Sequence, residues 1–273
     1  MDDHFSIIIL TQDEELNLST CLKSIIWCDD VIVIDSGSSD RTLEIARAGG
    51  CKILQRKFDN FGDQRNYVLD HADFKHAWVF HLDADERFTE ALRRECEEKI
   101  AEDTLSGFLV PSKLMLGQQW LKRTGCYPVY QMRFHKLGEV RFIPYGHGQR
   151  ETESKRGIGT LREPYIHYNF SKGLADWCRR HVAYAEREAK LEAPVFKMGD
   201  LFARDAVLRR RTLKALTWRF PFRPLLKFCY LYFLRRGFLD GVAGFKYALM
   251  NGYYEFMVGL FKWEQINKID TLK

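Results

Sequence analysis

The chain has 273 residues, of which 46% are hydrophobic and 29% are charged, a composition that predicts a globular protein and excludes a largely disordered one. Its formal net charge is +5, but residues 1–154 carry 26 acidic and 19 basic side chains, whereas residues 155–273 carry 11 acidic and 23 basic ones. This asymmetry predicts two regions with different partners.

The first third of the chain alternates apolar runs with amphipathic segments. Apolar runs rich in β-branched residues predict buried strands at residues 5–10, 31–35, 51–55 and 77–82. Helices are predicted at residues 41–48 and 61–72, and from the capping-box spacing of residues 11–14 onward. The first helix is expected to bury Leu16, Cys21, Leu22, Ile25 and Ile26. This alternation predicts the α/β class, with a mostly parallel central sheet.

The pattern changes after a predicted helix at residues 89–101. Residues 107–111, 130–135 and 162–168 are predicted strands, and the chain is predicted to be helical from residue 172 to its end. We therefore expect an α/β domain at residues 1–170, with a distinct subregion from about residue 105, and a basic, aromatic-rich helical extension at residues 171–273.

Polar side chains follow three of the predicted strands directly. Thr11, Asp35 and Asp83 each stand where a strand ends. Because ligands of open α/β sheets bind at the carboxyl ends of the strands, these residues predict a binding site at one edge of the sheet.

Asp83 and Asp85 are two carboxylates two residues apart at a strand end. Such a pair can hold Mg²⁺ or Mn²⁺ together with phosphate oxygens. The cation would neutralise the charge on a departing diphosphate. Paired acids are also common in ordinary surface loops, so this motif needs support from its surroundings.

The loop after the second strand, residues 36–42, combines small hydroxyl side chains with a glycine. Together with Asp35 it can hydrogen-bond the base and the ribose of a nucleotide. The alternative is an ordinary turn that is capped by Asp40 and leaves Arg41 in solvent.

Taken together, these segments resemble glycosyltransferase family 2, a group of inverting enzymes with the Rossmann-like A-type nucleotide-diphospho-sugar transferase fold. Residues 10–15 resemble the family's opening motif, with Asp13 where the family usually has Asn. Residues 35–40 resemble its nucleotide loop, residues 64–66 its helix beside the donor, and residues 83–86 its metal motif.

The resemblance implies a role for each matching residue. Thr11 and Glu14 would line the nucleotide pocket, Asp35 would meet the base and Arg65 the diphosphate. The alternative for Arg65 is a solvated charge on a helix surface. The expected donor-binding residues are Thr11, Glu14, Asp35, Gly37, Ser38, Arg65, Asp83 and Ala84, and the expected metal ligands are Asp83 and Asp85.

An inverting transferase also needs a group that accepts the acceptor's proton. Residues 145–151 resemble the Val-His-Glu motif of lipopolysaccharide-core glucosyltransferases, with extra residues between His147 and Glu151. The resemblance implies Glu151 as the base, followed by His147 and then Asp176. The alternative for Glu151 is a solvated loop acid.

In similar proteins, the region that contains Arg133 and His135 shapes the acceptor side. Trp120 and Tyr130 could stack on a sugar ring there, or they could be core aromatics. Residues 167–173 also recur in transferases of this type, and their role does not follow from spacing.

Basic and aromatic residues are concentrated in the C-terminal region. Residues 197–236 contain 11 basic and 2 acidic side chains, interleaved with phenylalanine and tyrosine. Because such helices suit an anionic bilayer, we expect peripheral contact with the inner face of the cytoplasmic membrane. The alternative is a helical cap that packs on the first domain or on a partner subunit. Nucleic acid is not an expected partner, because no nucleic-acid motif accompanies these residues.

Several features predict a cytoplasmic location. The acidic N-terminus lacks the basic region of a signal peptide, and no apolar run reaches the roughly 18 residues of a spanning helix. The seven cysteines have no C-x-x-C spacing, which argues against a disulfide framework or a structural zinc site.

The sequence therefore predicts an inverting, metal-dependent glycosyltransferase. It would move a sugar from a UDP-sugar to a lipid-linked or lipopolysaccharide-core saccharide in bacterial surface glycan biosynthesis. A sugar-nucleotide pyrophosphorylase is one alternative, although residues 11–16 lack the required glycine-rich basic loop. A catalytically silent, membrane-associated binding protein is another, and a homo-oligomer remains an open alternative to a monomer.

Overall fold

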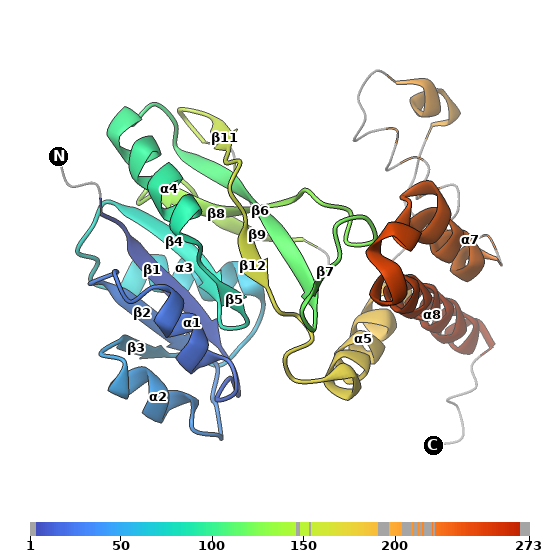
Figure 1. The fold of residues 1–273 in the computed structure, drawn as a ribbon, viewed down its shortest axis with the longest axis horizontal. Helices are drawn as coiled ribbons and strands as arrows, with labels where there is room; N and C mark the ends of the chain where they lie inside the picture. The colour runs from blue at the N-terminus through green and yellow to red at the C-terminus, as the bar shows by residue number, and fades with distance from the viewer. Residues whose placement is uncertain are drawn as a thin grey trace. The chain divides into compact units, whose positions relative to one another are not determined.

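A computed structural model of the protein describes residues 4–145, 148–152, 154–190, 197–203 and 222–267, together with residues 209, 212, 215 and 220. The chain divides into two units, Met1–Leu174 and Ala175–Lys273 (Figure 1). Each unit has its own buried hydrophobic cluster.

The centre of the sheet in the first unit is parallel. Its strands lie in the order β3 (Lys52–Gln55), β2 (Val31–Asp35), β1 (Ser6–Thr11) and β4 (Trp78–Asp83). The connecting helices are α1 (Leu18–Ser24), α2 (Thr42–Ala48) and α3 (Phe61–His71). Thr11 pairs with Asp35 and Leu10 with Asp83, so the register brings the ends of β1, β2 and β4 to one edge.

The remainder of the sheet is mixed because β8 (Val129–Lys136) runs antiparallel to both β4 and β6 (Gly107–Leu116). β12 (Tyr165–His167) joins β6 in parallel, and β5 (Glu86–Arg87) joins β12 antiparallel. The other elements of this unit are α4 (Glu90–Glu102), β7 (Gln119–Trp120), β9 (Phe142–Tyr145), β10 (Gly148–Glu151) and β11 (Ile158–Thr160). The short strand β5, which directly follows β4, therefore pairs with β12, a strand about eighty residues later in the chain.

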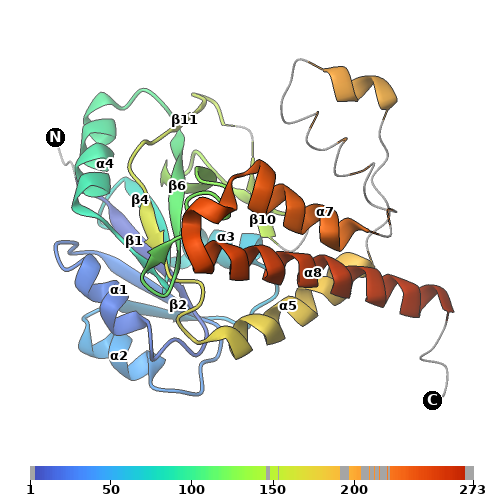
Figure 2. The ribbon, with the colours of Figure 1, turned by 45° about the vertical axis from the view of Figure 1, so that its right-hand side comes forward.

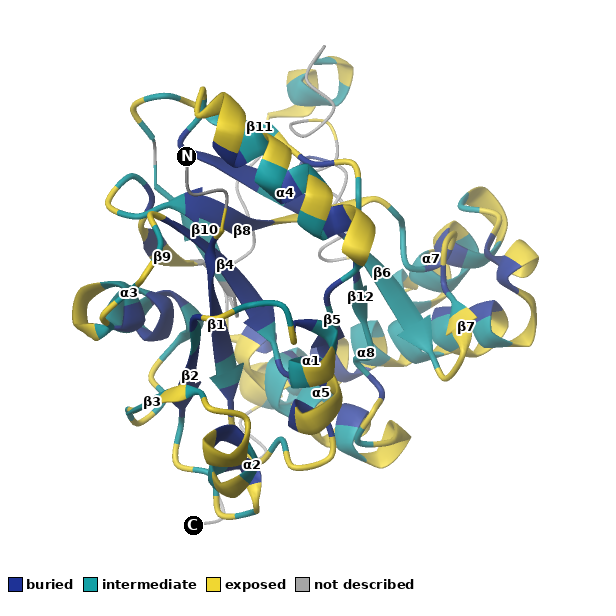
Figure 3. Cartoon of the chain, turned by 60° about the vertical axis from the view of Figure 1, so that its left-hand side comes forward, coloured by how far each residue is buried: buried dark blue, intermediate teal, exposed yellow. Residues whose placement is uncertain are grey.

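Helices cover both faces of this sheet. On one face, Ile7 of β1 shares a buried cluster with Leu18 of α1 and Leu92 of α4. On the other face, Ile8 shares a cluster with Val68 of α3. Neighbouring residues of β1 thus serve opposite layers, which explains why the strand is apolar throughout. Figure 3 shows the buried strands between helices whose outer faces are exposed.

The predicted α/β class with a parallel central sheet is confirmed, but the predicted start of the first helix is wrong. α1 begins only at Leu18. The residues between β1 and α1 form a loop instead. In this loop the backbone N–H of Glu14 donates to Oγ1 of Thr42, the first residue of α2, at 2.7 Å. Leu16 and Ile26, both expected in the core, are 69% and 85% exposed.

The second unit is helical in its described part. Its elements are most of α5 (Leu174–Ala189), η1 (Met198–Phe202), α7 (Arg223–Cys229), the π-helical turn η3 (Tyr230–Leu234), η4 (Gly237–Asp240) and α8 (Gly241–Asn267). Ala185 of α5 packs with Met257 and Val258 of α8. The helices α7 and α8 lie side by side (Figure 2). Among the described residues, no helix is both long enough and apolar enough to cross a bilayer.

Two histidines form a hydrogen-bonded pair inside the sheet of the first unit. His81 of β4 and His135 of β8 are fully buried, with their Nε2 atoms 2.9 Å apart. Nδ1 of His135 lies 3.2 Å from the carbonyl oxygen of Lys136, which assigns the ring proton of His135 to Nδ1. Nε2–H of His81 therefore donates to Nε2 of His135. Burial lowers the pKa of both rings, that of His135 to about 4, so the pair is neutral at neutral pH.

We expect this pair to make the protein less stable at pH 5 than at pH 7. The ordinary pKa of 6.5 applies to His135 in the unfolded chain, whereas in the folded chain burial and the charges of Arg65 and Arg141 oppose protonation. Stability that is present above pH 6.5 is therefore lost as the pH falls. The loss from His135 alone is about 2 kcal/mol at pH 5.

Urea unfolding of the wild type and of His135→Gln at both pH values measures this effect. His135→Gln removes the titrating group and should show a weaker pH dependence. His71→Gln, at an exposed position on α3, is the matched control and should behave as the wild type does. An equal pH dependence of the wild type and His135→Gln would contradict the assignment.

Candidate functional site

Asp35, at the end of β2, organises the loop that follows it. Its fully buried side chain accepts hydrogen bonds at Oδ2 from the N–H groups of Gly37 (3.0 Å) and Ser38 (2.9 Å). Its Oδ1 accepts from the hydroxyls of Thr11 (3.1 Å) and Ser38. The φ of Gly37 is 90°, a conformation that favours glycine. Four of the predicted donor-binding residues, Thr11, Asp35, Gly37 and Ser38, therefore lie together.

The loops after β1 and β2 are joined by hydrogen bonds. The N–H of Asp13 donates to Oγ of Ser38 (2.9 Å), and the N–H of Ser39 donates back to Oδ1 of Asp13 (2.7 Å). The N–H of Glu15 donates to Oδ2 of Asp40 (3.0 Å). The two loops thus form one preorganised rim at the carboxyl edge of the sheet.

Two buried arginines hold the acidic motif that ends β4. Oδ1 of Asp83 accepts from Nη2 of Arg65 (3.1 Å), and Oδ2 accepts from Nη2 of Arg133 (2.8 Å). The same nitrogen of Arg133 donates to Oε1 of Glu86 (2.7 Å), whose Oε2 accepts the N–H of Asp83 (2.8 Å). Arg65, Arg133 and Glu86 are at most 3% exposed. Two carboxylates and two guanidinium groups thus form one cluster, which is buried except at Asp83, whose side chain is 31% exposed.

The charges of this cluster shift the pKa values of its members. Burial opposes ionisation of Asp83, but the charges of Arg133 and Arg65 outweigh it and hold the pKa of Asp83 well below its usual range. Burial lowers the pKa of Arg65 to about 10 and raises the pKa of Glu86. Asp83 and Arg65 are therefore both charged at neutral pH.

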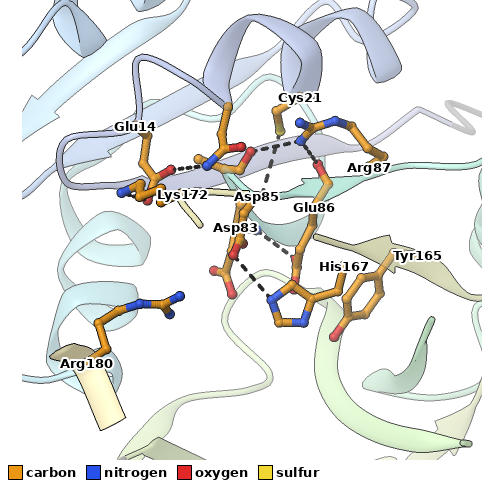
Figure 4. A network of polar contacts seen from close by, with 12 residues as sticks. Glu14, Cys21, Asp83, Asp85, Glu86, Arg87, Tyr165, His167, Lys172 and Arg180 are labelled. Atoms are coloured by element: carbon orange, nitrogen blue, oxygen red, sulfur yellow. Dashed lines mark hydrogen bonds and ion pairs between the residues drawn. The ribbon is translucent and has the colours of Figure 1, made fainter. Parts of the chain in front are cut away.

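Asp85 faces a histidine from a distant part of the chain. The antiparallel pairing of β5 with β12 places His167 opposite Glu86, and the N–H of Tyr168 donates to the carbonyl oxygen of Asp85 (2.9 Å). Nε2 of His167 then lies 3.4 Å from Oδ2 of Asp85 (Figure 4). Burial opposes protonation of His167, but the charge of Asp85 outweighs it and the pKa of His167 is raised to about 9. The side chains of His167 and Asp85 are 24% and 20% exposed, so the pair is accessible.

The segment that carries His167 continues to Lys172, which contacts the loop after β1. Nζ of Lys172 lies 2.6 Å from Oε1 of Glu14 and 3.3 Å from the carbonyl oxygen of Gln12. The other carboxylate oxygen of Glu14 accepts from Nδ2 of Asn17 (2.8 Å). In the view of Figure 4, Glu14 and Lys172 lie to the left of Asp85, and His167 lies to its right.

The Asp85–His167 pair fits a divalent cation. Carboxylate and imidazole are ligands that Mn²⁺ accepts, and Mg²⁺ sites use one or two carboxylates with water and substrate phosphates. Asp83, the other predicted ligand, has each oxygen engaged by an arginine. Within the described residues, no three or more His, Cys, Asp or Glu side chains are grouped as a metal site. The remaining ligands would therefore come from water and a bound diphosphate.

Some predicted residues occupy different surroundings from those expected. The methyl group of Ala84 is buried in the core, and its carbonyl oxygen accepts from Nη1 of Arg87 (3.0 Å). Arg65 is buried beside Asp83, so the interpretation as a solvated surface charge is wrong. Arg133 and His135, expected beside the acceptor, are instead buried in the sheet because they pair with the acidic motif and with His81.

Within the described residues of the first unit, no candidate base contacts the cluster of Asp83, Glu86, Arg65 and Arg133. Glu151 lies on β10, two residues after Gln149, whose Oε1 accepts from Nε of Arg65 (2.9 Å). The backbone of Glu151 pairs with Phe142 of β9, and its side chain makes no hydrogen bond or ion pair with any described residue. His147 lies outside the described residues, and Asp176 belongs to the second unit.

Sequence reasoning assigned no site role to four residues of this arrangement, namely Glu86, Gln149, His167 and Lys172. Glu86 carried a signal, since it is the last residue of the acidic motif. His167 and Lys172 lie within the recurring segment 167–173, but only the pairing of β5 with β12 reveals what that segment contacts. Gln149 had no signal beyond its proximity to Glu151.

Comparisons with known proteins agree with this geometry. The model of the family described as "Glycosyl transferase family 2" matches residues 6–149. A lipopolysaccharide core biosynthesis glycosyltransferase, LpsC of Rhizobium meliloti (strain 1021), is 23% identical over 270 residues, which cover 92% of this chain and 89% of that protein. An uncharacterized glycosyltransferase of Rickettsia bellii is 22% identical, covering 92% of this chain and 83% of its own.

Solved structures of similar shape include TarS residues 1–349 from S. aureus. That chain aligns with a TM-score of 0.46 and 14% identity, covering 97% of this chain and 92% of its own. Glucosyl-3-phosphoglycerate synthase from Mycobacterium tuberculosis, in complex with Mn²⁺, UDP-glucose and phosphoglyceric acid, aligns with a TM-score of 0.46 and 16% identity. That alignment covers 68% of this chain and 77% of the synthase.

Proposed function

Because the chain belongs to glycosyl transferase family 2, we propose that this glycosyltransferase moves a sugar from a UDP-sugar to a saccharide acceptor with inversion at the anomeric carbon. The observation that carries the proposal is the accessible Asp85–His167 pair. It lies at the edge of the sheet where β2 ends and the loop after Asp35 begins. A nucleoside would occupy the rim, and its diphosphate would extend towards Asp85.

In this proposal Asp85 and His167 hold Mg²⁺ or Mn²⁺, and the imidazole of His167 releases its proton when the cation binds. When bound, the cation would offset the negative charge of the departing nucleoside diphosphate. Arg65 and Arg133 each bind one oxygen of Asp83 and hold its side chain in one orientation. Asp83 would therefore line the site beside the ribose and the metal without acting as a mobile ligand. The two arginines would thus hold Asp83 in place beside the two partly exposed ligands, Asp85 and His167.

The acceptor hydroxyl would attack the anomeric carbon on the face opposite the diphosphate. As the new C–O bond forms, the bond from that carbon to the phosphate oxygen breaks and the hydroxyl proton passes to a base. We assign this base to Glu151, whose side chain has no partner among the described residues. Glu151 shares a strand with Gln149, the residue that contacts Arg65.

The acceptor that we propose is a lipid-linked or lipopolysaccharide-core saccharide. Support comes from the relative LpsC, whose name states lipopolysaccharide core biosynthesis and whose similarity extends over 92% of this chain. Such an acceptor is anchored in a bilayer, so the proposal requires contact with the inner face of the cytoplasmic membrane.

The surface for this contact is proposed to be the apolar face of α8. Seven exposed apolar side chains repeat there at intervals of three or four residues, which places them on one side of the helix. They are Val242, Phe245, Leu249, Tyr253, Phe256, Leu260 and Trp263. The opposite side of α8 carries the buried Val258, and Ala248 and Met257 are buried on the two flanks.

The charges near the apolar face of α8 favour a lipid surface, rather than a second copy of the chain, as the partner that covers this face. Arg236 and Lys246 are exposed near the apolar face, whereas Asp240 is buried and Glu255 forms an ion pair with Arg223 (2.7 Å). Exposed basic residues beside aromatic side chains suit anionic headgroups. The cores of protein interfaces, by contrast, are depleted in lysine.

The metal assignment predicts that Asp85→Ala weakens Mn²⁺-dependent binding of UDP by about tenfold or more, because one of two protein ligands is lost. Calorimetric titration with UDP, and with GDP as comparison, with and without Mn²⁺, measures this effect. Asp29→Ala is the matched control, since Asp29 pairs with His76 (2.8 Å) at a surface position. Undiminished Mn²⁺-dependent binding by Asp85→Ala would refute the assignment.

The base assignment predicts that Glu151→Gln lowers kcat by about 10²- to 10⁴-fold while UDP binding stays within about twofold of the wild type. Single-turnover transfer assays and calorimetry provide the two measurements. Glu98→Gln, at an exposed position on α4, should leave both unchanged. Near-normal turnover by Glu151→Gln would exclude Glu151 as the base.

The membrane proposal predicts that the protein sediments with vesicles containing phosphatidylglycerol and much less with phosphatidylcholine vesicles. Leu249→Asp or Phe256→Asp should reduce that binding by about tenfold, because each places a charge on the apolar face. Ile26→Asp, at another exposed apolar position, should have no effect. Equal binding by all variants, or a dimer that Phe256→Asp dissociates without any vesicle binding, would reject the lipid assignment.

A further inference from the structure

Lys172 has hydrogen-bonding capacity that its described contacts do not use. An ammonium group has three N–H donors, and those of Lys172 have two recorded acceptors, Oε1 of Glu14 at 2.6 Å and the carbonyl oxygen of Gln12 at a long 3.3 Å. Its side chain is 24% exposed, and that of Glu14 is 18% exposed. The ion pair is therefore reachable from solvent, unlike the buried Arg133–Glu86 pair.

The two arginines of the site are themselves buried and are already committed to acids. Nη2 of Arg65 and Nη2 of Arg133 both bind Asp83, and Arg133 also binds Glu86. A diphosphate that arrives between the rim and Asp85 would add negative charge beside Glu14 and Asp85. Lys172, which is partly exposed, could meet it without breaking a contact of either buried arginine.

The segment that carries Lys172 is anchored beside Asp85. The N–H of Tyr168 donates to the carbonyl oxygen of Asp85 (2.9 Å), and the N–H of Ser171 donates to the carbonyl oxygen of Tyr168 (2.9 Å). Gly173 follows with a φ of 88°, a left-handed conformation that turns the chain away. This tight turn keeps Lys172 against the loop after β1.

We propose that Lys172 is a binding residue for the diphosphate of the donor, which its ammonium group contacts in exchange for Glu14. The inference rests on the proposed function, since it requires a nucleoside diphosphate at this edge. It assigns to the segment 167–173 a direct part in recognising the donor. Glu14 then acts as the resting partner of Lys172 rather than as a permanent one.

Binding of UDP and of uridine to Lys172→Ala, in the presence of Mn²⁺, tests the proposal. Lys172→Ala should weaken UDP binding by about tenfold, because a charge-assisted hydrogen bond to phosphate is lost. Uridine has no phosphate, so its affinity should change less than about twofold. Lys172→Arg should recover part of the UDP affinity, since it restores a cationic donor.

Lys99→Ala is the matched control. Lys99 forms an ion pair with Glu102 at 2.7 Å on α4, and its side chain is 25% exposed, so the substitution removes a similar pair away from the site. Equal losses of UDP and uridine affinity in Lys172→Ala would show that Lys172 only anchors the loop, and unchanged UDP affinity would exclude the contact. Failure of the wild type itself to bind UDP would instead overturn the proposed function, and this inference with it.

Discussion

Asp83 and Glu86 lie three residues apart at the end of a buried strand, and one guanidinium group lies between them. Nη2 of Arg133 donates to both carboxylates, at 2.8 and 2.7 Å. Removing one partner of such a buried pair costs about 3–5 kcal/mol, because a charge is left without compensation. Since Arg133 is on β8, the same contact helps to fix the register of β8 against β4, and with it the pairing of His81 with His135.

Local patterns were sufficient to predict the parallel strands and the acids at their ends. Asp35, Asp83 and Asp85 follow apolar runs directly, and strand order alone brings their loops to one edge. The partners of these acids could not be predicted in this way. His167 meets Asp85 through a pairing of β12 with β5, and Arg133 reaches Asp83 through a reversed strand. Both contacts depend on non-local register, which no window of sequence contains.

The first helix illustrates a competition between a local signal and a tertiary one. The capping-box spacing favoured a helix from residue 11, but the N–H of Glu14 donates to Thr42 and that of Glu15 to Asp40. The first N–H groups of a helix have no partner within the helix and need a cap. Here the N–H groups of Glu14 and Glu15 find partners in the loop after β2 and in α2 instead. The chain thereby gains a rim for the site in place of one additional helical turn, and Leu16 is left in solvent.

The charged acids and cations of the site occur in equal number. Glu14, Asp83 and Asp85 are matched by Lys172, Arg65 and Arg133. Burial raises the pKa of Glu86 and favours its neutral form, and His167 is neutral when it serves as a metal ligand. Opposite charges a few ångströms apart largely cancel at longer distances. These six charged groups therefore exert little long-range attraction or repulsion on an approaching anion. The rate of donor capture should accordingly depend on diffusion and local fit, with only a weak response to ionic strength.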